Sequence, residues 1–566
     1  MERMQKVKQL LADIYGAETG QAAFERLEPI IEKFAGQKRK KEEFFSQDDV
    51  VLITYGDTLQ KDGQTPIAAL HEFANNYLKG TISTVHFLPF FPYSSDDGFS
   101  VMDFFEINPE LGSWQNVNDI GSDFQLMFDY VVNHFSSKSH WFDDYLSNRI
   151  GFEDFAIEVD PTLDLSRVTR PRSLPLLSEY QKKDGRPVHL WTTFSADQID
   201  FNFASLNVLA KMTEVLLFYV QQGASILRQD AIAYLWKEIG TTCIHLPQTH
   251  AVVKLFRAIL DLVAPDVMIV TETNVPHAEN ISYFGNGRDE AQMVYNFTLP
   301  PLLFYSFVKE DATVLTDWAK GLHLKSSSNT FFNFTASHDG IGVRPLEGIL
   351  PPQELDALVE VVKTNGGQVS YKSNPDGTDS PYELNITYVD AILADKNSSR
   401  ADRFLASQSI QYALPGVPAT YIHSLLGSRN WTKGVQKTNR ARTVNREKLQ
   451  VEEVIKELKN PESFRSQVFY PYIELIKTRK MQPAFHPNAE FEILELGPKV
   501  FAIRRSSDDQ TIYALTNISS SEATVSIAKI EAAKAMTDLI TGKSYAPDNL
   551  TLKPYQYVWL INPPKK

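Results

Sequence analysis

Eight short apolar segments, most of them separated by helical patterns, are the feature of this 566-residue chain that most restricts its fold. Amphipathic stretches such as LNVLAKMTEVLLFYVQQG and THAVVKLFRAILDLV precede the fourth and fifth segments. Strands that alternate with helices pair in parallel, so the pattern predicts an α/β fold, a (β/α)8 TIM barrel. The eight predicted strands span 50–54, 82–88, 124–130, 225–230, 267–272, 293–297, 331–336 and 418–422.

Three regions lie outside the predicted barrel ranges of 49–134 and 201–490, and one insertion lies within the second range. Residues 1–48 have apolar positions at helical spacing and predict an N-terminal helical extension. Residues 135–200, rich in Asp, Pro, Arg and aromatic residues, predict an inserted subdomain B, and 340–400 predict a loop-rich insertion within the barrel. Short alternating runs such as KVFAIRR and YQYVWLI predict a C-terminal antiparallel β-domain over 491–566.

The composition narrows the classes of partner. The net charge of −14 argues against nucleic acid, because phosphate binding needs a basic face. The charged start of the chain has no apolar signal core, and no segment approaches the roughly 18 apolar residues of a membrane span. The single cysteine, Cys243, excludes a disulfide framework within the chain. We therefore expect a cytoplasmic protein without nucleic-acid or membrane partners. The oligomeric state stays open, a homodimer included.

Polar and ionisable side chains gather at the places where the predicted strands end. The carboxyl ends of barrel strands share one rim, and the loops that extend from them build active sites. Such residues at the ends of at least six strands therefore predict a functional site. They are Asp57, His86, Asp129, Asn133, His134, Arg228, Asp230, Glu272, His338 and Asp339.

Arg228 and Asp230 stand two residues apart at the end of the fourth strand. Alternate residues of a strand share a face, so both charges point the same way. In a buried strand an unpaired charge is expensive, which leaves a structural ion pair or a site that needs both groups. With Glu272 and Asp339, Asp230 forms a three-carboxylate set. Such a set suits glycoside chemistry or a metal ion, and spacing alone does not choose between them.

Four motifs give the chain a resemblance to a known family. DYVVNH, ILRQDAIAY, IVTETN and FTASHD resemble, in order, the signatures of the α-amylase superfamily, glycoside hydrolase family 13. HFLPFFPYSSDDGFSVMDF, RPRSLPL, WTTFSADQIDFN and VNRE narrow the resemblance to its sucrose-phosphorylase subgroup, and SSDDGFSV, GTTCIHL and NPDGT resemble the glucosylglycerate phosphorylases within it. Two positions depart from the family pattern: Thr242 in GTTCIHL, and Gln229, where the family usually has Leu. Gln229 should point away from the sugar.

The resemblance implies catalytic roles for the three acids. Asp230 would be the nucleophile that forms a glucosyl ester, kept ionised by the nearby cation of Arg228. Glu272 would protonate the leaving oxygen and later act as base, and Asp339 would stabilise the oxocarbenium-like transition state. The resemblance further implies a set of glucose-binding groups, which are Asp57, His86, His134, His338 and Arg446.

A phosphorylase also needs a cation for phosphate, and Arg is the best fit because of its forked geometry. Arg170 and Arg172 lie in the expected acceptor loop, and Tyr382 lies in the loop facing it. The same cations could bind a carboxylate or a phosphate group on the acceptor. Phe194 and Tyr234 either stack on the sugar or pack in the barrel, and Gln198 is an acceptor-site candidate.

The predicted activity follows from these roles. We expect a retaining α-glucosyl phosphorylase that reversibly converts a small α-glucoside and phosphate into α-glucose 1-phosphate and the aglycone by double displacement. The first candidate substrate is 2-O-α-glucosylglycerate, before sucrose, sucrose 6-phosphate and glucosylglycerol. Asn133 matches a calcium ligand of amylases, but the subgroup generally works without calcium, so we expect no metal and no cofactor. The alternatives are a hydrolase or transglucosidase on the same scaffold and a catalytically inactive carbohydrate-binding protein.

Overall fold

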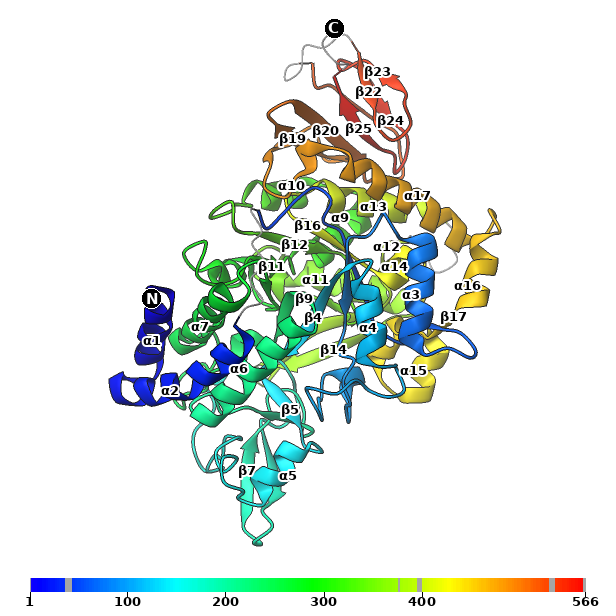
Figure 1. The fold of residues 1–566 in the computed structure, drawn as a ribbon. Helices are drawn as coiled ribbons and strands as arrows, with labels where there is room; N and C mark the ends of the chain where they lie inside the picture. Colours follow the sequence, from blue (N-terminus) through cyan, green and yellow to red (C-terminus); the bar gives the residue numbers. More distant parts are fainter. Residues whose placement is uncertain (1, 36–42, 375–376, 394–399, 529–534, 563–566) are drawn as a thin grey trace.

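The computed structural model describes residues 2–35, 43–374, 377–393, 400–528 and 535–562. At its centre eight parallel strands close into a barrel in the order β1-β16-β12-β11-β10-β9-β4-β3 (Figure 1). Each strand agrees with its predicted segment to within two residues at either end, so the predicted α/β barrel is confirmed. The strands are β1 (Val51–Thr54), β3 (Thr84–Phe87), β4 (Gln125–Val131), β9 (Ala224–Asp230), β10 (Met268–Thr271), β11 (Met293–Tyr295), β12 (Thr330–Phe334) and β16 (Val417–Tyr421).

Helices on the outside of the barrel connect most of these strands. In α6, the Ser205 side chain accepts hydrogen bonds from the backbone N–H groups of Asn207 and Val208, which caps the helix start. The apolar side of α6 is buried against the barrel, which explains its hydrophobic periodicity. The main barrel helices are α3 (Pro66–Tyr77), α4 (Trp114–Gly121), α6 (Leu206–Gln221), α7 (Pro247–Val263), α9 (Leu299–Lys309), α13 (Ala401–Ala413) and α17 (Phe464–Lys480).

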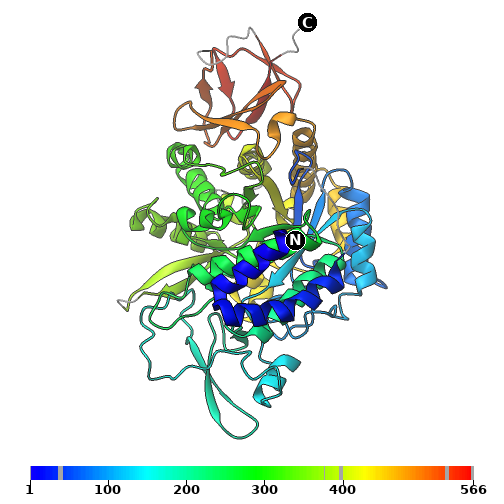
Figure 2. The ribbon, with the colours of Figure 1, turned by 60° about the vertical axis from the view of Figure 1, so that its left-hand side comes forward.

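The N-terminal extension forms two helices, α1 (Glu2–Tyr15) and α2 (Ala17–Phe34), which pack against α7 and α6 respectively (Figure 2). The Tyr15 hydroxyl donates to the Phe203 carbonyl at 2.7 Å and ties the first helix to the loop before α6. Residues 36–42 of the predicted extension lie outside the described residues. The two helices therefore brace the flank of the barrel.

Two insertions extend from the carboxyl rim of the barrel. Between β4 and α6 lies the lower subdomain of Figure 1, with β5 (His134–Ser136), α5 (His140–Leu146), β6 (Leu177–Gln181), β7 (Pro187–Trp191) and β8 (Gln198–Asp200). The insertion after β12 is more regular than the loop-rich segment expected, because residues on both sides of its turn signals pair into a sheet. Its elements are β13 (Ile341–Gly342), α11 (Pro352–Thr364), β14 (Gln368–Ser373), β15 (Asp379–Asn385) and α12 (Tyr388–Ile392).

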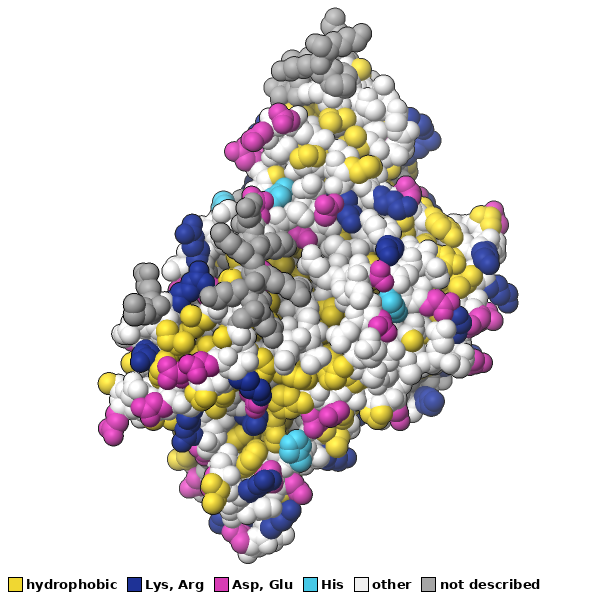
Figure 3. Space-filling model, viewed as in Figure 1, with side chains coloured by type: hydrophobic (Ala, Val, Ile, Leu, Met, Phe, Trp, Pro, Cys, Tyr) yellow, Lys and Arg dark blue, Asp and Glu magenta, His cyan; other side chains and the backbone are white. Residues whose placement is uncertain are grey.

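The C-terminal part of the chain forms the antiparallel β-domain at the top of Figure 1. Its six-stranded sheet has the order β18-β19-β20-β25-β22-β23, and β21 and β24 form a separate pair. No described helix has the length and apolar character that a membrane crossing requires. On the face shown in Figure 3, basic and acidic side chains are interspersed over the described surface. The strands are β18 (Glu490–Glu495), β19 (Val500–Ser507), β20 (Gln510–Asn517), β21 (Ala523–Val525), β22 (Met536–Asp538), β23 (Ser544–Tyr545), β24 (Leu550–Leu552) and β25 (Tyr557–Ile561).

Gln229 is an unusual residue for the middle of a barrel strand. It is fully buried, and neither its amide oxygen nor its amide nitrogen has a hydrogen-bond partner among the described residues. Strand alternation turns it to the opposite face from Arg228 and Asp230. Its register neighbour on β10 is Thr271, whose buried hydroxyl also lacks a described partner. An unpaired buried amide costs about 1–3 kcal/mol, so Gln229 weakens the barrel at this point.

We expect Gln229→Leu to stabilise the protein without changing its turnover. Leucine keeps a similar volume and removes the unpaired amide. For a chain of this length the gain corresponds to a rise of about 1–2 °C in the midpoint of thermal unfolding. Scanning calorimetry measures it, with the exposed Gln450→Leu as the matched control. An unchanged midpoint would mean that ordered water satisfies the Gln229 amide.

Candidate active site

The three predicted catalytic acids line one pocket at the carboxyl end of the barrel. Asp230 is the last residue of β9, Glu272 follows β10 directly, and Asp339 lies in the loop after β12. The empty space between the lining atoms, counted out to the open mouth, is about 750 Å³. The other predicted residues that line it are His134, Arg172, Phe194, Gln198, Tyr234, His338 and Tyr382.

Arg228 lies behind the pocket and holds its acidic wall together. Its guanidinium donates to Asp129 and, at 2.8 Å, to Asp230 Oδ1. It lies 4.0 Å from Glu272 Oε2. His86 completes the cluster with a 2.9 Å hydrogen bond between its Nε2 and Asp129 Oδ2, and both of these side chains are fully buried. The pair at the end of β9 is therefore a structural ion pair that also positions a carboxylate in the pocket.

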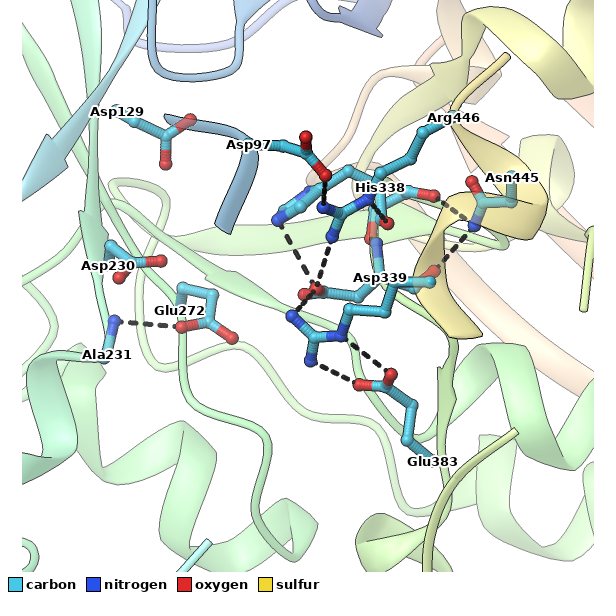
Figure 4. A network of polar contacts seen from close by, with 12 residues as sticks. Asp97, Asp129, Asp230, Ala231, Glu272, His338, Asp339, Glu383, Asn445 and Arg446 are labelled. Atoms are coloured by element: carbon cyan, nitrogen blue, oxygen red, sulfur yellow. Dashed lines mark hydrogen bonds and ion pairs between the residues drawn. The ribbon is translucent and has the colours of Figure 1, made fainter. Parts of the chain in front are cut away.

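Glu272 is held by the backbone that follows β9. The Ala231 N–H donates to Glu272 Oε2 at 2.9 Å (Figure 4), and Ala231 has φ 51°, a left-handed conformation that costs energy for a residue other than glycine. The strained turn thus places an amide donor directly after Asp230. It fixes the orientation of the Glu272 carboxyl.

The two carboxyls of Asp230 and Glu272 share an environment that favours one proton between them. Burial raises the pKa of Glu272 to about 7, against the opposing effect of Arg228, and the neighbouring carboxylate adds to the rise. Burial also raises the pKa of Asp230, but Arg228 donates directly to this carboxyl. Two coupled groups titrate as a pair, and the direct contact with Arg228 favours the charge on Asp230. The proton therefore resides on Glu272.

Asp339 has the opposite electrostatic environment. Arg442 Nη1 lies 2.7 Å from Asp339 Oδ1, and Arg446 Nη2 lies 3.8 Å from the same oxygen. Burial alone would raise the pKa of Asp339, but these two guanidiniums outweigh it and hold the pKa below its usual value. Arg442 is itself held by Glu383 of β15, which accepts from its Nε at 2.9 Å (Figure 4). Asp339 is therefore ionised.

Two neutral histidines border the acids. His338 stacks on Phe99 with ring centroids 4.6 Å apart and planes 10° apart. Burial, Arg446 and Arg228 all lower the pKa of His338 well below its usual value, so the ring is uncharged. Burial also lowers the pKa of His134, whose Nε2 lies 3.1 Å from Gln198 Nε2 and 2.9 Å from the Phe99 carbonyl. Neutral imidazoles of this kind can hydrogen-bond to sugar hydroxyls without adding charge.

Arg172 supplies the cation at the mouth of the pocket. Its guanidinium lies 5.4 Å from the ring centre of Tyr382 and 6.0 Å from that of Phe194. Phe194 belongs to the insertion after β4 and Tyr382 to the insertion after β12, so Arg172 connects the two insertions. No hydrogen bond or ion pair with a described residue uses its side chain, which leaves its donors available to an anion.

Five of the predicted site residues do not line the pocket. Asp57 is not among the pocket-lining residues and forms an ion pair with Lys448. Arg170 donates to the Leu174 carbonyl within its own loop and does not line the pocket. Arg446 donates to the His338 carbonyl at 2.8 Å and to Asp97, so it supports the wall. His86 and Arg228 likewise support the wall of the pocket, from the side that faces the barrel interior.

Several pocket residues escaped the sequence analysis. Asp96, Asn274, Glu383 and Arg442 all line the pocket. Asp96 belongs to the motif SSDDGF, and both it and Asp97 have positive φ, a rare conformation for residues other than glycine. The Asp-Asp pair before Gly98 is the sequence feature from which Asp96 could have been predicted as a site residue. The contact between Arg442 and Glu383 of β15 joins residues 59 positions apart in the chain, and no local sequence pattern predicts it.

A lysine lies at the position that resembles a calcium site of amylases. Lys237 Nζ is 2.9 Å from Asn133 Oδ1 and also pairs with Asp200, and all three side chains are buried. Among the described residues no group of three or more His, Cys, Asp or Glu side chains could hold a metal ion. The Lys237 ammonium thus contacts the oxygen atoms that a metal ion would otherwise bind.

An eight-stranded barrel with a buried arginine and three acids at its carboxyl rim defines a class, the α-amylase type of enzyme that acts on α-glucosides. The family model for the alpha amylase catalytic domain matches residues 75–341, and that for the maltogenic amylase C-terminal domain matches 491–559. Glucosylglycerate phosphorylases from Spirochaeta thermophila and Escherichia coli are 48% and 45% identical to this chain, over 99% and 98% of it and 99% and 100% of their own lengths. The chain belongs to the glucosylglycerate phosphorylase family of that class.

A solved structure supports the same fold. The sucrose 6F-phosphate phosphorylase from Thermoanaerobacter thermosaccharolyticum superimposes with a TM-score of 0.73 at 24% identity, covering 89% of this chain and 98% of that one. At this identity the similarity concerns the fold alone. The predicted enzyme class and family are thus confirmed by the sequence relatives.

Proposed function

We propose that the protein is a retaining glucosylglycerate phosphorylase, which converts 2-O-α-glucosylglycerate and phosphate into α-glucose 1-phosphate and glycerate. The observation behind this proposal is the unpaired guanidinium of Arg172 at the mouth of a pocket that contains all three acids. Phosphate and the glycerate carboxylate are both anions, and they enter the same side of the pocket in successive half-reactions. One cation therefore serves both.

The first half-reaction breaks the glucosidic bond. Asp230 is ionised beside Arg228 and attacks the anomeric carbon, which forms a glucosyl ester. Glu272 gives its proton to the leaving glycerate oxygen. Asp339 stabilises the positive charge that develops on the sugar ring, and Arg442 and Glu383 keep its carboxylate in place.

The second half-reaction releases the product. Glu272, now deprotonated, takes a proton from phosphate, whose oxygen attacks the anomeric carbon and returns Asp230 as a carboxylate. Two inversions restore the α configuration. No cofactor and no metal takes part in these steps, because Asp230, Glu272 and Asp339 supply the proton and the charges that they need. Phosphate is the co-substrate.

The acceptor test uses the reverse reaction. Purified protein is incubated with α-glucose 1-phosphate and glycerate, glycerol, fructose or fructose 6-phosphate, and phosphate release is measured. We expect glycerate to give the largest kcat/KM. Equal release without any acceptor would indicate a hydrolase, and a preference for a neutral acceptor would reject glycerate as the natural aglycone.

The shared proton predicts a pH profile. Glu272 must be protonated to act as acid, and burial raises its pKa to about 7. We therefore expect kcat/KM for the glucoside to fall with rising pH through an apparent pKa near 7. In a double displacement this parameter reports glucosyl transfer to Asp230 alone and is independent of phosphate ionisation. With a glucosyl fluoride as the substrate, whose leaving group needs no proton, kcat/KM should no longer fall at high pH. If kcat/KM for the fluoride still falls at high pH, a group other than Glu272 is titrating.

A further inference from the structure

A second hollow opens directly outside the catalytic pocket, and we call it the vestibule. It encloses about 880 Å³, including its open mouth. It shares part of its wall with the pocket, so a molecule that lies in the vestibule is next to the acceptor side of the site. The residues common to both are Asp96, Arg172, Phe194, Gln198 and Arg442.

Four arginines line the vestibule, and two of them already have carboxylate partners. Arg442 is bound by Asp339 and Glu383. Arg446 is bound by Asp97 and the His338 carbonyl. These two guanidiniums therefore belong to the wall of the sugar pocket.

The other two guanidiniums, those of Arg172 and Arg440, make no hydrogen bond or ion pair with any described residue. Arg172 belongs to the subdomain after β4, and Arg440 belongs to the loop after α15 (Thr432–Thr438). The vestibule also contains two carboxylates, of which Asp97 is neutralised by Arg446. Asp96 is the remaining negative charge. Two available cations from opposite rim segments thus face one Asp.

We propose that the vestibule is a binding site for a phosphate group, held by Arg440 together with Arg172, which borders both the vestibule and the acceptor subsite. The forked guanidinium matches phosphate oxygens, and two such groups suit a dianion better than a single carboxylate. The phosphate group has two sources: a phosphate ester on an aglycone, such as phosphorylated glycerate, or free inorganic phosphate. This inference rests on the proposed function, because it places the new site next to the acceptor.

The test compares Arg440→Ala with wild type in the reverse reaction. The acceptors are glycerate and phosphorylated glycerate, and the latter is also tested as a competitive inhibitor of glycerate; the KM for inorganic phosphate is measured in the forward reaction. Arg440→Ala should weaken binding of phosphorylated glycerate by about tenfold or more and leave the KM for glycerate nearly unchanged. Arg440→Lys, which keeps the charge, should lie between. Lys437→Ala is the matched control, because it removes a positive charge from α15 outside the vestibule.

The outcomes distinguish free phosphate from a phosphorylated aglycone and show whether the vestibule binds phosphate at all. If only the KM for inorganic phosphate rises, the site holds free phosphate. If Lys437→Ala causes the same change, or if none of the three ligands responds to Arg440→Ala, the vestibule is not a phosphate site. Turnover of wild-type protein with glycerate in the same assays tests the proposed function separately.

Discussion

Asp230→Asn should abolish turnover while the protein stays folded. The amide cannot form the glucosyl ester, so both half-reactions lose their shared intermediate. The loss should be at least about 10⁴-fold in kcat, as for other residues that act as the nucleophile. The fold should persist, because Arg228 keeps Asp129 as its buried partner. Phosphorolysis rates and the thermal unfolding midpoint measure the two parts of this prediction.

The matched control is Asp356→Asn, which makes the same chemical change at an exposed position of α11 and should leave turnover unchanged. The wild-type product is a second check, since two displacements at Asp230 give α-glucose 1-phosphate. A β product, or substantial turnover of Asp230→Asn, would contradict a double displacement at this residue.

The alternation of strands and helices was enough to predict the barrel, because parallel strands and their covering helices leave strong local patterns. Asp230 and Glu272 could be placed from the same pattern, since Asp230 ends β9 and Glu272 directly follows β10. Asp57 shows the limit of this reasoning. It also follows a strand, but a loop residue can turn in any direction, and here it turns towards Lys448.

Contacts between distant rim segments could not be predicted from the sequence. Arg442 and Glu383 belong to different rim segments, and only the closed barrel brings them together at Asp339. Arg170 and Arg172 illustrate the same point at close range. They stand two residues apart in one loop, yet the first donates to a carbonyl of its own loop and the second faces the pocket. Periodicity does not distinguish such neighbours outside helices and strands.

Arg172→Ala should convert the protein from a phosphorylase towards a hydrolase. A charge-assisted hydrogen bond contributes roughly 1.5–3 kcal/mol, and 1.4 kcal/mol corresponds to about a factor of ten. Phosphorolysis should therefore fall by about ten- to a hundredfold. Hydrolysis of the same glucosyl ester should fall much less, because water needs no cation. The ratio of glucose 1-phosphate to free glucose, measured at saturating glucoside, reports the change.

The neighbouring arginine makes the experiment specific. Arg170→Ala removes the same charge from the same loop, but Arg170 donates to the Leu174 carbonyl and does not line the pocket, so the product ratio should change little. Arg172→Lys keeps a charge without the forked geometry and should recover only part of the phosphorolysis. The preference among acceptors should also change: in Arg172→Ala, the rate with glycerate should fall more than the rate with glycerol. If Arg172→Ala lowered phosphorolysis and hydrolysis equally, its contacts with Phe194 and Tyr382 would be purely structural, and the anion would bind elsewhere.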